Sequence, residues 1–303
     1  MTPAQTGHAA MLVFSALVAG SFSLGALVSN DIAPLALNAV RFWVAAGVIG
    51  LVLLGTKTPL SSVRRAPWRY AVLGGLFGIY FALMFEGLKT APPVSAAAVF
   101  TLTPVIAAGF GWILLRQVTT PRMALALTIG AVGALWVIFR ADLAALRAFA
   151  IGRGETIYFV GVICHALYTP MVRKLNRGEP ALVFTFGTLL GGGVVLTVVG
   201  IGDIVSTPWT ALPSLVWLTL FYVAVIASAA SVWLLQIATL RLPSAKVMAY
   251  TYLVPSWVIC WEIALGQPVP APLVLGGILI TIVALILLLR DEEKRPVEQN
   301  SAG

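Results

Sequence analysis

The sequence predicts an all-α integral membrane protein whose ten transmembrane helices form two five-helix inverted-topology repeats. Its composition gives the first indication: 60% of the 303 residues are apolar and 10% are charged, against about 45–50% and about 25% in an ordinary soluble domain. So little polar surface cannot cover a water-soluble globule, and we therefore expect lipid around the chain. A β-barrel is not expected, because the sequence lacks alternating segments of about 10 residues.

Ten apolar stretches are long enough to cross about 30 Å of hydrocarbon. The first is too long and lacks the basic flank of a cleaved signal peptide, so we interpret it as a retained span. Because backbone polar groups in lipid must be hydrogen bonded within the protein, each stretch is predicted to be a helix of one bundle. In chain order the expected spans are 9–28, 33–54, 70–88, 92–115 and 123–139, then 156–172, 181–200, 214–238, 245–265 and 271–289.

The distribution of Lys and Arg predicts which ends of the helices face the cytoplasm. If the N-terminus is inside, the outer loops hold only Lys89, Arg140, Arg147 and Arg153 of the 19 basic residues, and a span holds Arg41. The others lie in inner loops and in the C-terminal tail, as the positive-inside rule requires. We therefore expect both termini to be cytoplasmic. The net charge of +8 then reflects topology, and we expect no nucleic-acid partner.

The two halves of the chain repeat a pattern around Pro104 and Pro255, each of which follows an apolar run. Because each half holds five spans, an odd number, the second half must enter the membrane from the opposite face, which makes the halves inverted repeats. Aligning the chain on the two prolines pairs Pro92 with Pro243, Val99 with Tyr250, and Thr101 with Tyr252.

The repeat predicts the organisation of the chain and a mechanism. We expect a first repeat over 1–140, an external connector over 141–155, a second repeat over 156–290 and a cytoplasmic tail over 291–303. Two similar halves related by an axis in the membrane plane can exchange conformations, so that a cavity opens to one side and then to the other. The pattern therefore favours an alternating-access transporter, and a duplicated helical scaffold, an enzyme or a channel are the alternatives.

Four stretches carry a resemblance to a known family: "AGSFSLG" with "PLALNAVRF", "TAPPVSAAAVFTLTPVIA", "CHALYTPMVRKL" and "LRLPSAKVMAYTYLVPS". In order and spacing they resemble the ten-helix, EamA-type exporters of the drug/metabolite transporter superfamily. The resemblance implies an inner-membrane exporter of small molecules, with helices one to four and six to nine around the path and helices five and ten outside it. Many relatives carry glutamate where this chain has Gln117 and Gln267, so a carboxylate role is not carried over to those positions.

The candidate solute-contacting residues are midplane aromatic and polar side chains. Tyr158, His165 and Tyr168 are seven and then three residues apart and so share one helical face. Packing in the core or in an interfacial belt is the alternative for such a stripe, although a buried tyrosine hydroxyl needs a partner. The full set is Phe22, Tyr80, Met84, Val99, Thr101, Thr103, His165, Tyr168, Tyr250 and Tyr252.

A second set of residues is predicted to act in gating or as hinges. A charged side chain inside a membrane is costly, so we expect Arg41, which lies in a span, to have a role either in helix packing or in gating. Pro104, Pro170 and Pro255 each remove a backbone donor within a helix, which gives a hinge or a static kink. Glu86 is three residues from Lys89, the spacing of a local ion pair, and Glu262 would face the outer mouth or pair with Arg41. The full set of gating or hinge candidates is Arg41, Glu86, Pro104, Pro255 and Glu262.

These features favour export of amino acids and similar metabolites. A cavity with few fixed charges suits neutral or zwitterionic solutes, whereas nucleotide sugars would need converging basic residues. An exporter of drugs or quaternary ammonium ions is the alternative, because aromatic faces attract organic cations. We expect no cofactor, no metal site and no enzyme activity, since the spans lack a zinc-ligand motif or paired aspartates. His165 is the midplane residue that could carry a proton, so coupling is either facilitated diffusion or weak proton antiport.

Overall fold

The computed structural model describes residues 2–56, 63, 66–139, 141–144 and 151–290. Within these ranges ten helices are long and apolar enough to cross a membrane, and no strand occurs, which confirms the predicted all-α fold with ten spans. The predicted tail 291–303 lies outside the described residues, as do Arg140 and Arg147 of the expected outer loops.

The first half of the chain contains the first five spans, and most of them begin at a proline. Proline suits the first helical position because the missing N–H would have no partner there, and its fixed φ fits the helix. Thr2 and Thr120 add side-chain caps, each accepting a hydrogen bond from a backbone N–H of the first turn. The helices are α1 (Pro3–Val28), α2 (Pro34–Gly55), α3 (Trp68–Gly87), α4 (Pro93–Phe100), α5 (Thr103–Leu115) and α6 (Pro121–Ile138).

The second half is less regular. The eighth span contains a nine-residue π-helix, which the sequence analysis does not predict, between two α-helical parts. The sixth span begins three residues before the expected position, so that Glu155 lies in a helix and not in the connector. The elements are α8 (Arg153–Leu175), α9 (Ala181–Val199), α10 (Ile201–Ser206), η1 (Trp209–Ala211), α11 (Ser214–Phe221), η2 (Tyr222–Ala230), α12 (Ser231–Thr239), α13 (Ser244–Ala249), η3 (Tyr250–Leu253), α14 (Val254–Ala264) and α15 (Pro272–Arg290).

The fourth and ninth spans are both interrupted at corresponding places. α4 ends at Phe100 and α5 starts at Thr103, directly before Pro104. In the ninth span, the 3-10 turn η3 separates α13 from α14, whose second residue is Pro255. Pro170, in contrast, lies inside the uninterrupted α8. The matched breaks agree with the predicted repeat, and movement about them stays a prediction.

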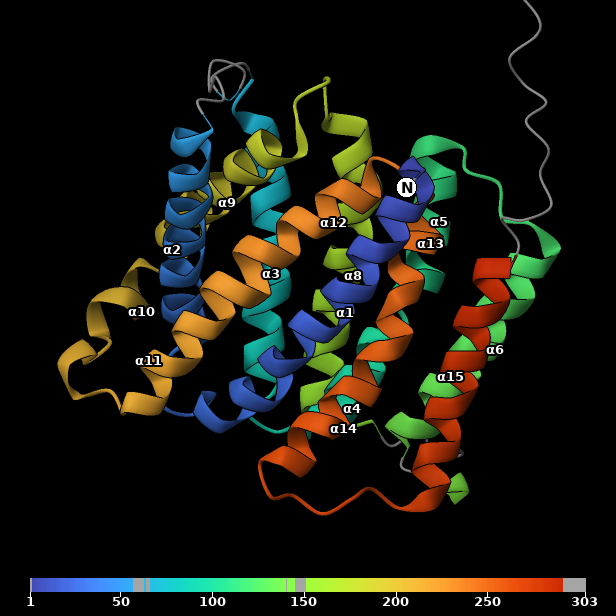
Figure 1. Ribbon diagram of the computed structural model, residues 1–303. Helices are drawn as coiled ribbons and strands as arrows, with labels where there is room; N and C mark the ends of the chain where they lie inside the picture. Colours follow the sequence, from blue (N-terminus) through green and yellow to red (C-terminus); the bar gives the residue numbers. More distant parts are fainter. Residues whose placement is uncertain (1, 57–62, 64–65, 140, 145–150, 291–303) are drawn as a thin grey trace, which may run out of the picture.

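The two halves pack into one bundle. α3 lies against α8 and α9, α2 lies against α9, and α1 lies against α12 and α14, so most interfaces join the two halves. α6 and α15 pack on each other at one side of the bundle (Figure 1), in agreement with the outer place that the resemblance implies for helices five and ten. α1 begins at the end of the bundle where the N-terminus is marked, and α8 begins at the opposite end (Figure 1). This arrangement supports the inverted relation of the halves.

Small residues allow α3 and α9 to approach closely. A Cβ on Gly74 would lie 2.1 Å from the backbone nitrogen of Gly192 and 2.4 Å from the carbonyl oxygen of Thr188. Backbone groups cannot move aside as a flexible side chain can. The contact therefore depends on glycine, as in other small-residue interfaces between membrane helices.

We expect Gly74→Ala to destabilise the protein by about 1–3 kcal/mol, because the methyl group would overpack this contact. The measurement is the melting midpoint of the detergent-purified protein, followed by tryptophan fluorescence. Gly47→Ala in α2 is the matched control, since a Cβ there meets nothing within 4 Å. Equal midpoints for the two alanine variants would contradict the close approach of α3 and α9.

Candidate functional site

A cluster of stacked rings occupies the interior of the bundle. We call it the central aromatic cluster, and its members come from α1, α3, α4 and α8. The His165 ring is centred 4.4 Å from Tyr80, 5.2 Å from Phe100 and 5.4 Å from Phe77. Phe77 also stacks on Tyr168, with centroids 4.7 Å apart. The cluster consists of Phe22, Phe77, Tyr80, Phe100, Tyr158, His165 and Tyr168.

The polar atoms of the cluster are only partly paired. The hydroxyl of Tyr158 donates a hydrogen bond to that of Tyr80 at 3.1 Å, and Gln236 Nε2 donates to the hydroxyl of Tyr168 at 2.9 Å. His165 is 1% exposed, yet neither of its ring nitrogens has a hydrogen-bond partner among the described residues. A buried polar group without a partner costs about 1–3 kcal/mol. A hydrogen bond to either nitrogen would remove that cost.

Four of the predicted solute-contacting residues meet in this cluster: Phe22, Tyr80, His165 and Tyr168. Met84, 1% exposed, packs in the same buried core. Sequence reasoning missed Gln236 of α12. The observation that could have identified it is that an amide side chain lies within an apolar span. The partner of Tyr168 thus comes from the eighth span.

The other five predicted contacts lie outside the cluster. Thr101 and Thr103 are buried, and their hydroxyls donate to carbonyl oxygens of their own helix turns. The hydroxyl of Tyr250 lies 3.0 Å from His8 Nδ1. The ring of Tyr252 points to α6, because a Cβ on Gly130 would touch it. Val99 lines a cavity that none of the cluster residues lines.

Arg41 ties α2 to the π-helix. Its Nε donates to Ser228 Oγ at 2.6 Å, and its Nη2 donates to the carbonyl oxygen of Ala227 at 2.9 Å. The guanidinium also lies 3.5 Å from the centre of the Phe81 ring, a cation–π contact. Among the described residues Glu262 is not one of its partners. The contacts favour the packing role for Arg41, and a gating role stays a prediction.

The two remaining acidic candidates differ in their surroundings. Glu86 forms the expected ion pair with Lys89, with Oε2 and Nζ 2.6 Å apart and both side chains partly exposed. Such exposed pairs contribute little to stability. Glu262 is half-buried near the end of α14.

The two glutamines that depart from the family pattern behave differently. Gln117 Oε1 accepts a hydrogen bond from the backbone N–H of Ser244 at 3.1 Å, which links the end of the fourth span to the start of the ninth. Gln267 is exposed after α14. An amide at Gln117 can therefore satisfy an otherwise free N–H at the first turn of α13.

Sequence reasoning also missed a buried ion pair between Arg69 and Glu179. Arg69 Nη2 lies 2.7 Å from Glu179 Oε1, and Nη1 donates to the carbonyl oxygen of Leu175. The other carboxylate oxygen of Glu179 accepts from the backbone N–H of Arg177. Burial acts to raise the pKa of Glu179, but the hydrogen bonds from Arg69 and Arg177 outweigh it, so the pKa is below its usual value. The pair joins the start of α3 to the loop between α8 and α9.

Comparison with known proteins identifies the fold's family. The model of the EamA-like transporter family matches residues 5–139 and again residues 152–290. The chain belongs to the EamA-like transporter family. Because the same family model matches both halves of this EamA-like chain, the match supports the predicted internal repeat.

Relatives and solved structures agree with this assignment. The chain is 28% identical over 278 residues to "Uncharacterized transporter YyaM" of Bacillus subtilis (strain 168), with 91% of both chains covered. A shorter match of 102 residues, 33% of each chain, is 35% identical to "Aromatic amino acid exporter YddG" of Ancylobacter novellus. A solved crystal structure superposes with a TM-score of 0.72 at 19% identity and covers 97% of this chain and 99% of its own. That likeness shows the fold.

We expect Glu179→Gln to lower the free energy of unfolding by about 1.5–3 kcal/mol at neutral pH, because it removes the charge that Arg69 binds. The folded-state pKa of Glu179 is lowered, so the contribution is complete above the ordinary carboxylate pKa and is lost as the pH falls through the folded value. The melting difference between wild type and variant should be constant from about pH 5 to 8 and shrink below about pH 4.

Glu86→Gln is the control for this measurement, since it removes the carboxylate of an exposed pair. Its effect should stay within about 1 kcal/mol. A pH-independent difference between wild type and Glu179→Gln would contradict the assigned role of the ion pair.

Proposed function

We propose that this EamA-family transporter exports small metabolites, most readily neutral or aromatic amino acids, from the cytoplasm. The observation that carries the proposal is His165, whose two unpaired nitrogens lie within the central aromatic cluster. A zwitterionic solute can supply the missing hydrogen bonds, and its apolar part can stack on the surrounding rings. Binding then removes a cost that the empty site carries.

The charge of the site supports the same class of solute. The members of the cluster are aromatic rings, and the amide of Gln236 donates to one of them. A cation nearby, Arg41, lies over the ring of Phe81, which contacts Phe77 and Tyr80. Polyphosphates and nucleotide sugars would need several arginine or lysine side chains directed at one point. The partial relative from Ancylobacter novellus is described as an aromatic amino acid exporter, which also favours amino acids.

Alternating access is the mechanism we assign to this export. Support comes from the family match to each half, from the breaks before Pro104 and Pro255, and from interfaces that join the two halves. In such folds a cavity between the repeats opens to one side at a time. The excess of basic residues in the expected inner loops favours the inner membrane with cytoplasmic termini. As a member of a transporter family, the chain is assigned no enzyme activity.

An exporter of drugs or quaternary ammonium ions is the second candidate. The stacked faces of Tyr80, Phe77 and Tyr168 favour it, because an organic cation without hydrogen-bond donors can bind over a ring. Such a cation leaves the nitrogens of His165 unpaired. The amino acid proposal therefore accounts for one more feature of the site.

Counterflow in proteoliposomes tests the proposal. We expect uptake of labelled phenylalanine to be stimulated by unlabelled phenylalanine inside the vesicles. The reason is that the site of a carrier returns to the outside faster with a solute bound than empty. A channel or a non-transporting scaffold would show no stimulation. Uptake of labelled tetraethylammonium that internal tetraethylammonium stimulates, with no such stimulation for any amino acid, would overturn the first candidate in favour of the second.

His165→Ala should weaken the apparent affinity for phenylalanine about tenfold, as expected for the loss of about one hydrogen bond to a buried group. His8→Ala is the matched control, because His8 lies at the start of α1 against Tyr250 and outside the cluster. Unchanged affinity in His165→Ala would remove His165 from the binding site.

We further propose facilitated diffusion as the energy mode. An imposed pH gradient should then leave phenylalanine flux unchanged in the wild type. A pH-driven flux that the wild type shows and His165→Ala lacks would replace facilitated diffusion by proton coupling.

A further inference from the structure

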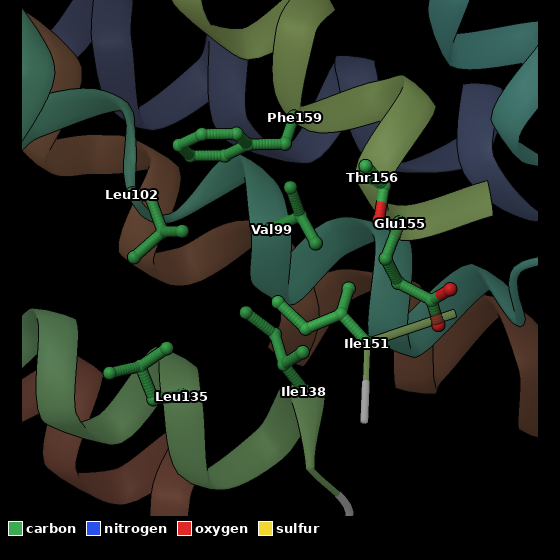
Figure 2. A pocket seen from close by; sticks show the side chains of 8 residues that line it. All are labelled: Val99, Leu102, Leu135, Ile138, Ile151, Glu155, Thr156 and Phe159. Atoms are coloured by element: carbon green, nitrogen blue, oxygen red, sulfur yellow. The ribbon is translucent and has the colours of Figure 1, made fainter. Parts of the chain in front are cut away.

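A cavity lies between the fourth, fifth and sixth spans, and none of the rings of the central aromatic cluster lines it. Its volume is about 440 Å³, within the usual range of about 300–1,000 Å³ for small-molecule sites. Two of its lining residues, Glu155 and Thr156, lie in the first turn of α8. The lining residues are Val99, Leu102, Leu135, Ile138, Ile151, Glu155, Thr156 and Phe159 (Figure 2).

Glu155 is the charged residue among the described residues that line this cavity. It is 6% exposed, and its Oε1 accepts a hydrogen bond from Ser95 at 2.8 Å. Its Oε2 receives no hydrogen bond from the described residues. Oε2 lies where a Cβ on Gly152 would come within 2.2 Å, so a glycine at the N-cap of α8 makes room for it.

Burial makes this carboxylate costly, although its place in the first turn of α8 offsets part of the cost, because a helix N-terminus favours an acidic side chain. Charged side chains inside membrane proteins are rare, and they usually pair with another charge or serve a site. One serine hydroxyl is a small compensation for a buried carboxylate, which can accept several hydrogen bonds. The hydrogen bond from Ser95 alone does not compensate for the buried charge of Glu155. A cationic partner for the carboxylate would.

The rest of the cavity is apolar. Figure 2 shows the Glu155 carboxylate at one end, Leu102 and Leu135 at the other, and the ring of Phe159 facing Ile138 across the space. The cavity is thus negative at one end and hydrocarbon-like over the remainder. A complementary molecule has a positive charge at one end and an apolar body.

We propose that this cavity binds an organic cation that carries an apolar group, with its ammonium against Glu155 and its apolar part between Leu102, Leu135 and Phe159. An anion would be repelled, and a neutral molecule would leave the carboxylate without a counter-charge. The site is independent of the solute proposed for the central cluster. Its cation is either a free solute or the ammonium headgroup of a lipid.

Equilibrium binding of labelled benzyltrimethylammonium to the full chain in phosphatidylglycerol nanodiscs tests the site, because these lipids carry no ammonium group. Neopentylbenzene, in which carbon replaces the ammonium nitrogen, should fail to compete. Glu155→Gln should weaken binding about tenfold or more. Asp31→Asn, which removes an exposed carboxylate outside the cavity, should leave binding unchanged.

A second variant keeps the test decisive if Glu155→Gln fails to fold. Leu135→Trp fills the apolar end of the cavity and should also weaken binding about tenfold. Wild-type affinity in either folded variant, equal losses in Asp31→Asn and Glu155→Gln, or effective competition by neopentylbenzene would overturn the proposal.

Adding phosphatidylethanolamine to the nanodiscs separates the two sources of the cation. If this lipid competes with benzyltrimethylammonium in the wild type but not in Glu155→Gln, the site is supported and its occupant is a lipid headgroup. If the lipid has no effect while the variants behave as expected, the site is supported and its occupant is a soluble cation.

Discussion

Polar groups in this protein must find partners without the help of water. In lipid, each unpaired backbone N–H or carbonyl costs several kcal/mol, so every span is helical. Interruptions of the helices lie within the bundle, at the breaks before Pro104 and Pro255 and in the π-helix. The same constraint places side chains: Arg41 uses a carbonyl oxygen and a hydroxyl of the π-helix, and Arg69 uses Glu179. Of the buried side chains for which the constraint is not fully met, His165 and Glu155 are the two around which we propose binding sites.

The spans, their order and the breaks of the fourth and ninth spans could be predicted because hydropathy and proline are local signals. The π-helix of Tyr222–Ala230 could not, since its sequence contains no proline or glycine that would mark an irregularity. The Arg69–Glu179 pair joins residues 110 positions apart, one in the first turn of α3 and one in the loop between α8 and α9, and no spacing rule connects them. Glu155 was not predicted as a site residue, because the expected connector 141–155 included it, whereas the structure places it in the first turn of α8.

In the candidate site, too, residues that share one helix face could be predicted together, whereas contacts between different helices could not. His165 and Tyr168 were grouped correctly because they lie on one face of one helix. Their meeting with Tyr80 and Phe22 depends on how α3 and α1 pack against α8, which helical periodicity alone does not determine. For Tyr252 the repeat gave the position along the ninth span but not its rotation, and the ring faces α6. Helix identity was thus predictable from the sequence, and helix rotation was not.

The partners of Arg41 have a consequence for biogenesis. Ser228 is 187 residues further along the chain, so at about 5–20 residues per second the ribosome needs about 10–40 s to supply it after Arg41 has been made. During that interval the cation of the nascent second helix can contact Asn38 and, once the third span is made, the ring of Phe81, but it lacks the hydroxyl and carbonyl oxygen of the eighth span. We expect the growing chain to hold this helix at the translocon or the bilayer surface until the eighth span emerges, so that insertion of the first half is completed by synthesis of the second.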